Sequence, residues 1–137
     1  MSLPTTDAKP IVLPELVVVP TATQIFMFSA ITWNRHRIHF DKEAAIEEGH
    51  KDVVVQRALI GNFLARLLEQ WLADRGAVRE LSWKVLNSAL PDRRLRCQGE
   101  AVRDAGNQFY CELRIVDEHE TVIATGKALC VENGTVA

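Results

Sequence analysis

Residues 56–75 read QRALIGNFLARLLEQWLADR, and a pair of apolar residues stands at every fourth position of this stretch. The pairs are Leu59/Ile60, Phe63/Leu64, Leu67/Leu68 and Trp71/Leu72. This spacing is typical of an amphipathic helix, and a stripe two residues wide indicates a helix that other structure largely encloses. We therefore expect a long central helix, with Gly76 as the glycine that follows its C-terminus.

The chain after this helix changes to a period of two, which is typical of β-strands. Alternating residues indicate three or four long strands, separated by turn residues at 91–92, 104–107 and 117–120. The residues that share a face in each strand are Leu81, Trp83 and Val85; Leu95, Cys97, Gly99 and Ala101; Phe109, Cys111, Leu113 and Ile115; and Val122, Ala124, Gly126, Ala128 and Cys130. The small residues among them allow a sheet to approach a helix closely. The pattern predicts an α+β fold, a curved antiparallel sheet wrapped around one long central helix.

The chain before the helix is less regular. Two prolines bracket an extended, peripheral run over residues 16–19. The apolar and aromatic run Gln24–Ser29 predicts a further strand. Asp41 is expected to cap a short helix over residues 42–48, which ends at Gly49.

Composition places the chain among ordinary globular proteins, with 137 residues of which 47% are hydrophobic and 25% charged. A formal net charge of −2 argues against a nucleic-acid partner. No apolar run approaches the ~20 residues of a membrane span, and the N-terminus lacks the layout of a signal peptide, so we expect a cytoplasmic protein. The three cysteines are too widely spaced for a disulfide framework or a CxxC metal pair. We expect a flexible tail over residues 1–10 and a single domain over 11–137.

The most specific motif is FSAITWNRHRIHFD, at residues 28–41. It resembles the hot-dog-fold hydratases and dehydratases of the MaoC-like family, in particular the branch of type 2 hydroxyacyl-thioester dehydratases and mesaconyl- or itaconyl-CoA hydratases. That branch reads roughly F-S-A-L-T-F-N-x-H-R-I-H-Y-D. The resemblance covers residues 11–131, and it implies a hot-dog fold. It also implies hydration of a 2-enoyl thioester, or the reverse dehydration of a 3-hydroxyacyl thioester, on coenzyme A or acyl carrier protein. No cofactor is implied beyond coenzyme A as part of the substrate.

The same resemblance assigns roles to single residues. His39 stands at the family's catalytic histidine, and Asn34 stands where the wider family has the catalytic aspartate. Residues Gln56-Arg57-Ala58 stand where the branch usually has His-Gly-Pro, whose glycine amide helps to bind the thioester oxygen. Without that glycine, the ligand approaches the backbone less closely.

Hydration of an enoyl thioester needs a base for water, a proton for the α carbon and a stabiliser for the charge on the thioester oxygen. Histidine suits the first two tasks because its ordinary pKa is about 6.5. The amide of Asn34 cannot act as a base, but it can hold the water. Backbone N–H groups at the start of the central helix suit the oxyanion. Asn34 and His39 converge on one water only if the backbone turns between them.

Each candidate also has a structural interpretation. His39 is alternatively a buried histidine bonded to a turn carbonyl, and Asn34 a helix N-cap. Asp41 is first of all an N-cap, with support of the His39 tautomer as a second role, and His36 supports the site or lies on the surface. The pattern His36-x-x-His39-x-Asp41 is too weak to indicate a metal site, and no metal is expected.

Three arginines at a strand start, Arg93, Arg94 and Arg96, are candidates for the phosphates of coenzyme A, with a solvated strand edge as the alternative. The free edges of an open sheet predict a homodimer or a heteromer with a related hot-dog subunit. The departure at residues 56–58 motivates a different function, a non-catalytic or half-site subunit that completes the acyl tunnel of a hot-dog partner. A hot-dog thioesterase would need a carboxylate on the central helix, where Glu69 is the only glutamate.

Overall fold

The central element is helix α3 (Arg57–Leu72), in a computed structural model that describes residues 9–104 and 106–134. Eight of its residues are buried: Leu59, Ile60, Gly61, Phe63, Leu64, Leu67, Leu68 and Leu72. Each large apolar side chain among them stabilises the fold by about 1.5–3 kcal/mol on burial. The long enclosed helix that the apolar pairs predicted is therefore confirmed, and it organises the core.

The end of α3 differs from the prediction. The helix closes at Ala73, whose φ is +51° and whose N–H donates to the Glu69 carbonyl. Gly76 instead begins strand β3 (Gly76–Val85). A Cβ at Gly76 would lie 2.4 Å from the Val131 carbonyl oxygen, so this glycine permits the close approach of two strands and does not follow the helix end directly.

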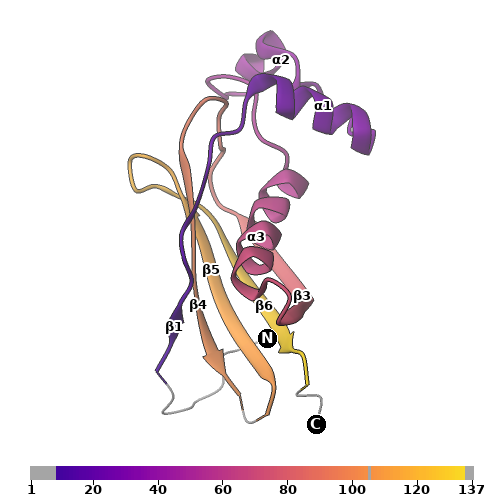
Figure 1. The fold of residues 1–137 in the computed structure, drawn as a ribbon. Coiled ribbons are helices and arrows are strands. Elements are labelled where there is room, and N and C mark those ends of the chain that lie inside the picture. The colour runs from indigo at the N-terminus through magenta and orange to yellow at the C-terminus, as the bar shows by residue number, and fades with distance from the viewer. Residues whose placement is uncertain (1–8, 105, 135–137) are drawn as a thin grey trace.

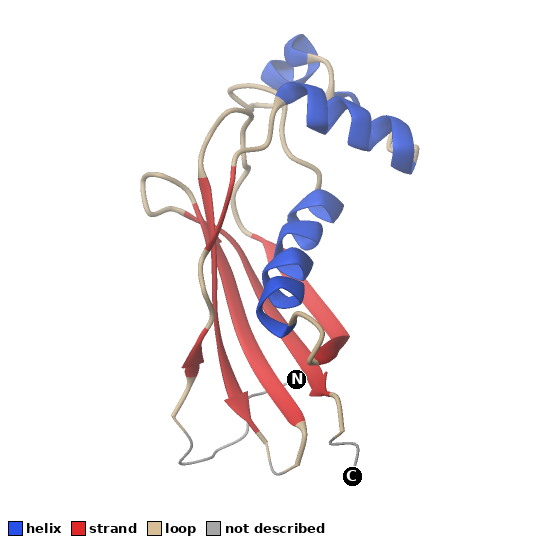
Figure 2. Ribbon diagram, in the orientation of Figure 1, coloured by secondary structure: helices blue, strands red, loops and turns tan. Residues whose placement is uncertain are grey.

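Strand β3 belongs to an antiparallel sheet with β4 (Leu95–Arg103), β5 (Gln108–Val116) and β6 (Val122–Glu132). The order is β1-β4-β5-β6-β3, and the short strands β1 (Ile11–Val12) and β2 (Leu16–Val18) both pair with β4. The sheet stays open and α3 covers one of its faces (Figure 2). The strand pattern and the α+β architecture predicted from the sequence are confirmed.

The contact between sheet and helix depends on small residues. A Cβ at Gly126 of β6 would lie 3.0 Å from Cδ1 of Leu64, so glycine lets α3 approach this strand. Cys97, Cys111 and Cys130 are free thiols buried in the same core. Burial raises the pKa of the Cys97 thiol to about 12, which makes it an unreactive packing residue.

The segment predicted as a strand over Gln24–Ser29 is a helix, and that prediction was wrong. It lies inside α1 (Ala22–Thr32), where the Thr21 hydroxyl accepts a hydrogen bond of 3.0 Å from the Gln24 N–H. Thr-x-x-Gln is a capping-box pattern, whereas four consecutive apolar residues fit either kind of element. The cap at Thr21, and not the apolar run, is therefore the sequence feature that distinguishes a helix from a strand here.

The segment that follows forms one turn of 3₁₀ helix, η1 (Arg37–His39), and then α2 (Lys42–Glu47). Asp41 caps α2 as predicted, since its Oδ1 accepts a hydrogen bond from the Ala44 N–H at 3.2 Å. Gly49, with a φ of +94°, follows the helix. Figure 1 shows α1 and α2 together beyond one end of the sheet, near the N-terminus of α3. None of the helices in the described ranges has the length and apolar character to cross a membrane.

Candidate active site

His39 is held beside the chain that enters α3. Its side chain is buried, with 8% of its surface exposed, and its Nδ1 lies 2.7 Å from the Val54 carbonyl oxygen. In return, the Val54 N–H donates to the Ile38 carbonyl at 3.0 Å. These two bonds join η1 to the segment just before the helix, so the ring lies near the N-terminus of α3.

The bond to Val54 determines the tautomer of His39. A carbonyl oxygen only accepts, so Nδ1 carries the proton and the lone pair of the neutral ring is on Nε2. Burial lowers the pKa of His39, and the nearby His36 and His50 lower it further against the opposing effect of the Val54 hydrogen bond. The ring is therefore neutral at pH 7, with Nε2 as an available base. The structural interpretation of His39 describes the same Nδ1 bond, and the two roles are compatible.

Asn34 lies half-buried in the turn between α1 and η1. Its N–H donates to the Ser29 carbonyl at 2.9 Å, and its Oδ1 accepts from the His36 N–H at 3.2 Å. The side chain thus stabilises a turn, and the helix N-cap interpretation was wrong because His36 is the residue that precedes η1. The His36 ring in turn stands edge-on to the His39 ring, with 5.8 Å between centroids. Asn34 and His39 are therefore connected through His36.

The two residues expected to support the site, Asp41 and His36, pair with Arg37 and Glu48. Asp41 Oδ2 lies 2.5 Å from Arg37 Nη2, and this hydrogen bond lowers the pKa of the Asp41 carboxyl. The Val54 carbonyl orients His39, so the second role predicted for Asp41 was wrong. His36 is exposed, with its Nε2 3.5 Å from Glu48 Oε1. Among the residues placed by the structure, no three His, Cys, Asp or Glu side chains gather as metal ligands would.

The side chain of Gln56 connects the start of α3 to α1. It is fully buried, and its Nε2 donates to the Ile25 carbonyl at 2.6 Å and to Ser29 Oγ at 2.8 Å, both on α1. Its Oε1 has no hydrogen-bond partner within the described chain. Gln56 therefore fixes α1, and the turn that follows it, to the start of α3.

The side chain of Arg57 also bonds to another part of this chain. Its Nη2 donates to the Trp83 carbonyl at 3.1 Å, and Trp83 Nε1 donates to the Arg57 carbonyl at 2.9 Å. At this helix start, the groups that could bind an oxyanion are therefore backbone N–H groups and not side chains. The first bond within the helix runs from the Ile60 N–H to the Gln56 carbonyl, so the N–H groups of residues 57–59 precede it. Ala58 is exposed here.

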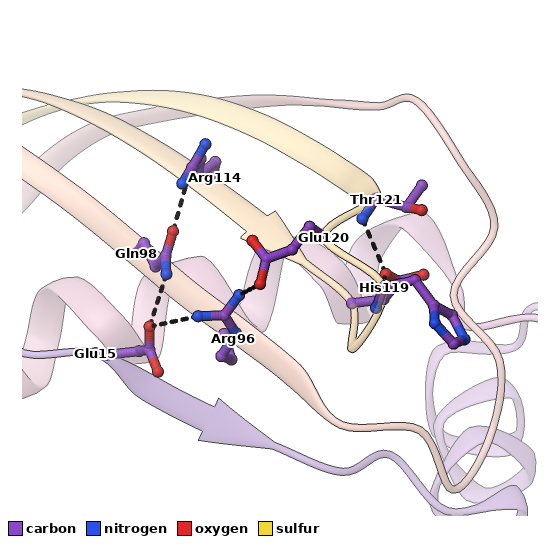
Figure 3. A network of polar contacts seen from close by, with 8 residues as sticks. Glu15, Arg96, Gln98, Arg114, His119, Glu120 and Thr121 are labelled. Carbon is purple, nitrogen blue, oxygen red and sulfur yellow. Dashed lines mark hydrogen bonds and ion pairs between the residues drawn. The ribbon is translucent and has the colours of Figure 1, made fainter.

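The three arginines proposed for phosphate binding lie at the start of β4. Arg93 Nη1 lies 3.4 Å from Glu118 Oε1. Arg96 pairs with both Glu15 and Glu120, in a network that continues through Gln98 to Arg114 (Figure 3). Arg94 has no hydrogen-bond or ion-pair partner in the described ranges. The Arg93–Glu118 pair is exposed, and such a pair contributes only about 0–1 kcal/mol, so a phosphate could replace Glu118; Arg96 is half-buried and held in its network.

Sequence reasoning missed a groove that Asn34 helps to line. It lies between α1 and η1, has a volume of about 450 Å³, and includes Trp33, Arg35 and Arg37 in its lining. The only sequence signal was the density of arginines and aromatic residues in the motif. The predicted strand over Gln24–Ser29 concealed it, because one wall of the groove is a face of helix α1.

Comparison with known proteins supports the family that the motif at residues 28–41 indicated. Residues 4–91 match the family model described as hydroxyacyl-thioester dehydratase type 2. A mesaconyl-C(4)-CoA hydratase of Chloroflexus aurantiacus is 38% identical over 71 residues, which are 47% of this chain and 25% of that protein. The chain thus matches about a quarter of the length of this curated relative.

Solved structures share the fold at low sequence identity. The ChsH1-ChsH2 complex from Mycobacterium tuberculosis gives a TM-score of 0.84 at 16% identity, covering 93% of this chain and 100% of the matched one. The (R)-hydratase of A. caviae involved in PHA biosynthesis gives 0.81 at 16% identity, covering 93% and 97%. The MaoC-like dehydratase from Rhodospirillum rubrum gives 0.75 at 14% identity, covering 94% of each chain.

The fold and the motif together define a hot-dog protein of the MaoC-like hydratase and dehydratase class. Within that class, the chain belongs to the hydroxyacyl-thioester dehydratase type 2 family.

Proposed function

We propose that this chain catalyses hydration of a 2-enoyl thioester, or the reverse dehydration of a 3-hydroxyacyl thioester, as a cytoplasmic protein. The observation that supports this most is the buried His39 ring, whose Nδ1 is held by Val54 while Nε2 is left as a base. The substrate carrier is coenzyme A or acyl carrier protein, and no further cofactor is needed.

In the hydration direction, the Asn34 amide holds a water molecule and His39 Nε2 removes its proton. The resulting hydroxide adds to the β carbon, and the electron pair of the double bond moves toward the thioester oxygen. The proton on His39 then passes to the α carbon, which restores the neutral imidazole. The backbone N–H groups at the start of α3 face the transient negative charge on the thioester oxygen.

We also propose that the chain works paired, as a homodimer or with a related hot-dog subunit. The outer edge of β3 pairs with no other strand within the described chain, and an open edge of ten residues favours association. Two structures that share the fold, ChsH1-ChsH2 and HadBC, a (3R)-hydroxyacyl-ACP dehydratase, are both complexes from Mycobacterium tuberculosis. The residues at 56–58 support the alternative that this chain is a half-site subunit, since Gln56 and Arg57 use their side chains to hold protein.

A thioesterase is less well supported by the geometry. Glu69 is exposed and lies twelve residues after Arg57 on α3. At 1.5 Å per residue, this is about 18 Å along the helix axis from the N-terminal N–H groups. A carboxylate at that distance does not share a site with the thioester oxygen.

The proposed function is tested by following loss of the enoyl thioester with the purified chain, alone and with a related hot-dog subunit. His39→Ala is expected to lower kcat by about 10²–10⁴-fold, the usual contribution of a general acid or base. His119→Ala, in an exposed loop, is the matched control and should keep full activity. A His39→Ala protein with more than half the activity would contradict the role of His39. Activity only in the presence of the partner would support the half-site alternative.

A further inference from the structure

Gln56 carries a fully buried amide whose orientation is determined by its partners. Its Nε2 lies 2.6 Å from the Ile25 carbonyl oxygen and 2.8 Å from Ser29 Oγ. A carbonyl oxygen only accepts hydrogen bonds, so the nitrogen of the amide, and not its oxygen, faces Ile25. Both hydrogens of this nitrogen therefore hold α1, which lies near the N-terminus of α3 in Figure 1.

The oxygen of the same amide is not paired in this way. Gln56 Oε1 is buried and accepts no hydrogen bond within the described chain. A buried acceptor without a partner gives up its bonds to water and gains none in return, which offsets much of what the two bonds of Nε2 contribute. An apolar side chain of similar length would avoid this cost. Stability alone therefore does not account for a glutamine here, and such a buried polar group indicates a role in the site.

Loss of this amide would leave no other polar group unpaired. In an α-helix the carbonyl of residue 25 accepts from the N–H of residue 29, so Ile25 does not need Gln56. The Ser29 hydroxyl can turn to the carbonyl four residues before it, which is again that of Ile25. We therefore expect a chain with methionine at position 56 to fold, and such a variant can be assayed.

Ser29 is the residue through which Gln56 reaches Asn34. Trp33 ends α1 with a φ of +57°, and the N–H groups of Trp33 and Asn34 both donate to the Ser29 carbonyl. A left-handed helix end of this kind fixes the direction of the chain that follows it. Gln56 holds the Ser29 hydroxyl while the turn closes on the Ser29 carbonyl, so the position of Asn34 depends on Gln56.

The backbone of Gln56 belongs to the other half of the site. Its carbonyl accepts the first bond of α3, from the Ile60 N–H at 3.0 Å, and it directly precedes the N–H groups proposed for the thioester oxygen. Val54, whose carbonyl orients His39, lies two residues earlier. One residue thus connects the turn of Asn34 to the segment that holds His39 and to the start of α3.

We propose, on the basis of the function proposed above, that Gln56 is a positioning residue. Its amide sets the distance between the Asn34 side chain, which holds the water, and the N–H groups at the start of α3, which face the thioester oxygen. The β carbon and the thioester oxygen belong to one short conjugated unit, so both contacts form together only at one distance. A misplacement of about 1 Å costs about 100-fold in rate. The departure from histidine at position 56 is then an exchange of one link for another.

The test replaces Gln56 by methionine and measures turnover of 2-enoyl-CoA thioesters by the chain in its active form, alone or with its partner. We expect Gln56→Met to lower kcat by about 10- to 100-fold, with a smaller change in KM because Gln56 does not contact the substrate. The melting temperature should be equal to or above that of the wild-type protein. Gln70→Met, the same change at an exposed position of α3, should alter neither. Gln56→His, which supplies a ring N–H donor, should recover part of kcat.

A double-variant cycle tests whether Gln56 acts through Ser29. Ser29→Ala removes the hydroxyl and keeps the carbonyl on which the turn closes. If the bond between these two side chains carries the effect, the double variant loses no more kcat than Gln56→Met alone. Two losses that multiply in the double variant would show that Gln56 acts by another route and would contradict the inference.

Hydrogen exchange tests the same link without turnover. The Asn34 N–H should exchange faster in Gln56→Met because its turn opens more often. The Val54 N–H, which donates to the Ile38 carbonyl in η1, should keep its wild-type rate and is the internal control.

Three results would overturn the inference: an unchanged kcat in folded Gln56→Met, a loss of kcat that follows an equal loss of stability, or an unchanged exchange rate at Asn34. If the wild-type protein turns over no enoyl thioester, the hydratase function itself fails. The exchange rate at Asn34 then still decides whether Gln56 positions its turn.

Discussion

At the scale of single residues, one hydrogen bond determines the tautomer of His39, and burial determines its charge. The ring is buried against the Val54 carbonyl, and burial lowers its pKa. In the unfolded chain the same side chain has a pKa of about 6.5. As the pH falls below that value, the unfolded chain therefore takes up a proton before the folded one. The stability contributed by a neutral His39 is complete above pH ~6.5 and is lost as the pH falls toward the folded pKa.

We therefore expect the melting temperature to decrease below pH ~6.5, with a smaller decrease in His39→Gln. Glutamine stays neutral and retains a donor for the Val54 carbonyl. Thermal unfolding of both proteins across this pH range measures the difference, and His119→Gln is the control that should follow the wild-type curve. Parallel curves for His39→Gln and the wild-type protein would show that His39 does not carry the pH dependence.

Substitutions of Asn34 test whether the site needs an amide or a carboxylate. Its Oδ1 accepts from the His36 N–H, and an aspartate oxygen can accept the same bond. Asn34→Asp should therefore keep the turn, and it should keep or raise activity because a carboxylate can also receive a proton from water. Asn34→Ala should lose about 10-fold or more in kcat through misplacement of the water. Steady-state kinetics on folded variants provide the comparison, and an inactive but folded Asn34→Asp protein would show that the site requires a neutral group.

At the scale of elements, the start of α3 is locked to β3 by a reciprocal pair. Arg57 donates to the Trp83 carbonyl, the Trp83 indole donates to the Arg57 carbonyl, and the guanidinium lies 5.2 Å from the ring centroid. Gly61 lies beneath this indole, where a Cβ would come within 2.3 Å of Trp83 Cζ2. The glycine thus allows the edge strand to hold the helix end whose N–H groups are proposed to bind the oxyanion.

Gly61→Ala is expected to destabilise the protein by about 1 kcal/mol or more, although alanine is the better helix former. The gain in helix propensity is about 1 kcal/mol, whereas overpacking against a fixed ring costs about 1–3 kcal/mol and also weakens the Arg57 bond. Urea unfolding measures the change. Asn62→Ala, at the exposed neighbouring position, should be neutral or slightly stabilising, and Trp83→Leu should relieve the penalty in the double variant. An unchanged midpoint for Gly61→Ala would show that the indole moves without cost.

At the scale of the whole molecule, an open sheet leaves two features for another chain. The outer side of β3 pairs with no other strand within the described chain, and α1 buries only Ile25 and Ser29 while Phe26, Met27 and Ile31 are exposed. Both favour association. We expect the protein to sediment at twice the mass of one chain or more at micromolar concentration, or to do so when mixed with its hot-dog partner. A stable monomer with full activity would contradict a site shared between subunits.

The patterns that predicted the architecture are local. Apolar pairs four residues apart predicted α3, and alternating apolar residues predicted β3 to β6. Asp41 caps α2, as expected. The same motif that indicated the family contains both Asn34 and His39, which lie in the turn after α1 and in η1. In these cases the interacting residues are close in the sequence, so their spacing alone determines which face they share.

Only the tertiary structure determined what the site residues touch. The His39 ring meets a carbonyl fifteen residues away, and Gln56 reaches one thirty-one residues away. Asp41 was expected to support His39 and instead holds Arg37, because the Arg37 guanidinium is one helical turn away and competes for the carboxylate. The helix over Gln24–Ser29 has a local cap at Thr21, but the groove that Trp33 and Arg35 line is formed by the packing of α1 beside η1. Such partners follow from how elements pack, and the packing of distant segments is not encoded in the spacing of neighbouring residues.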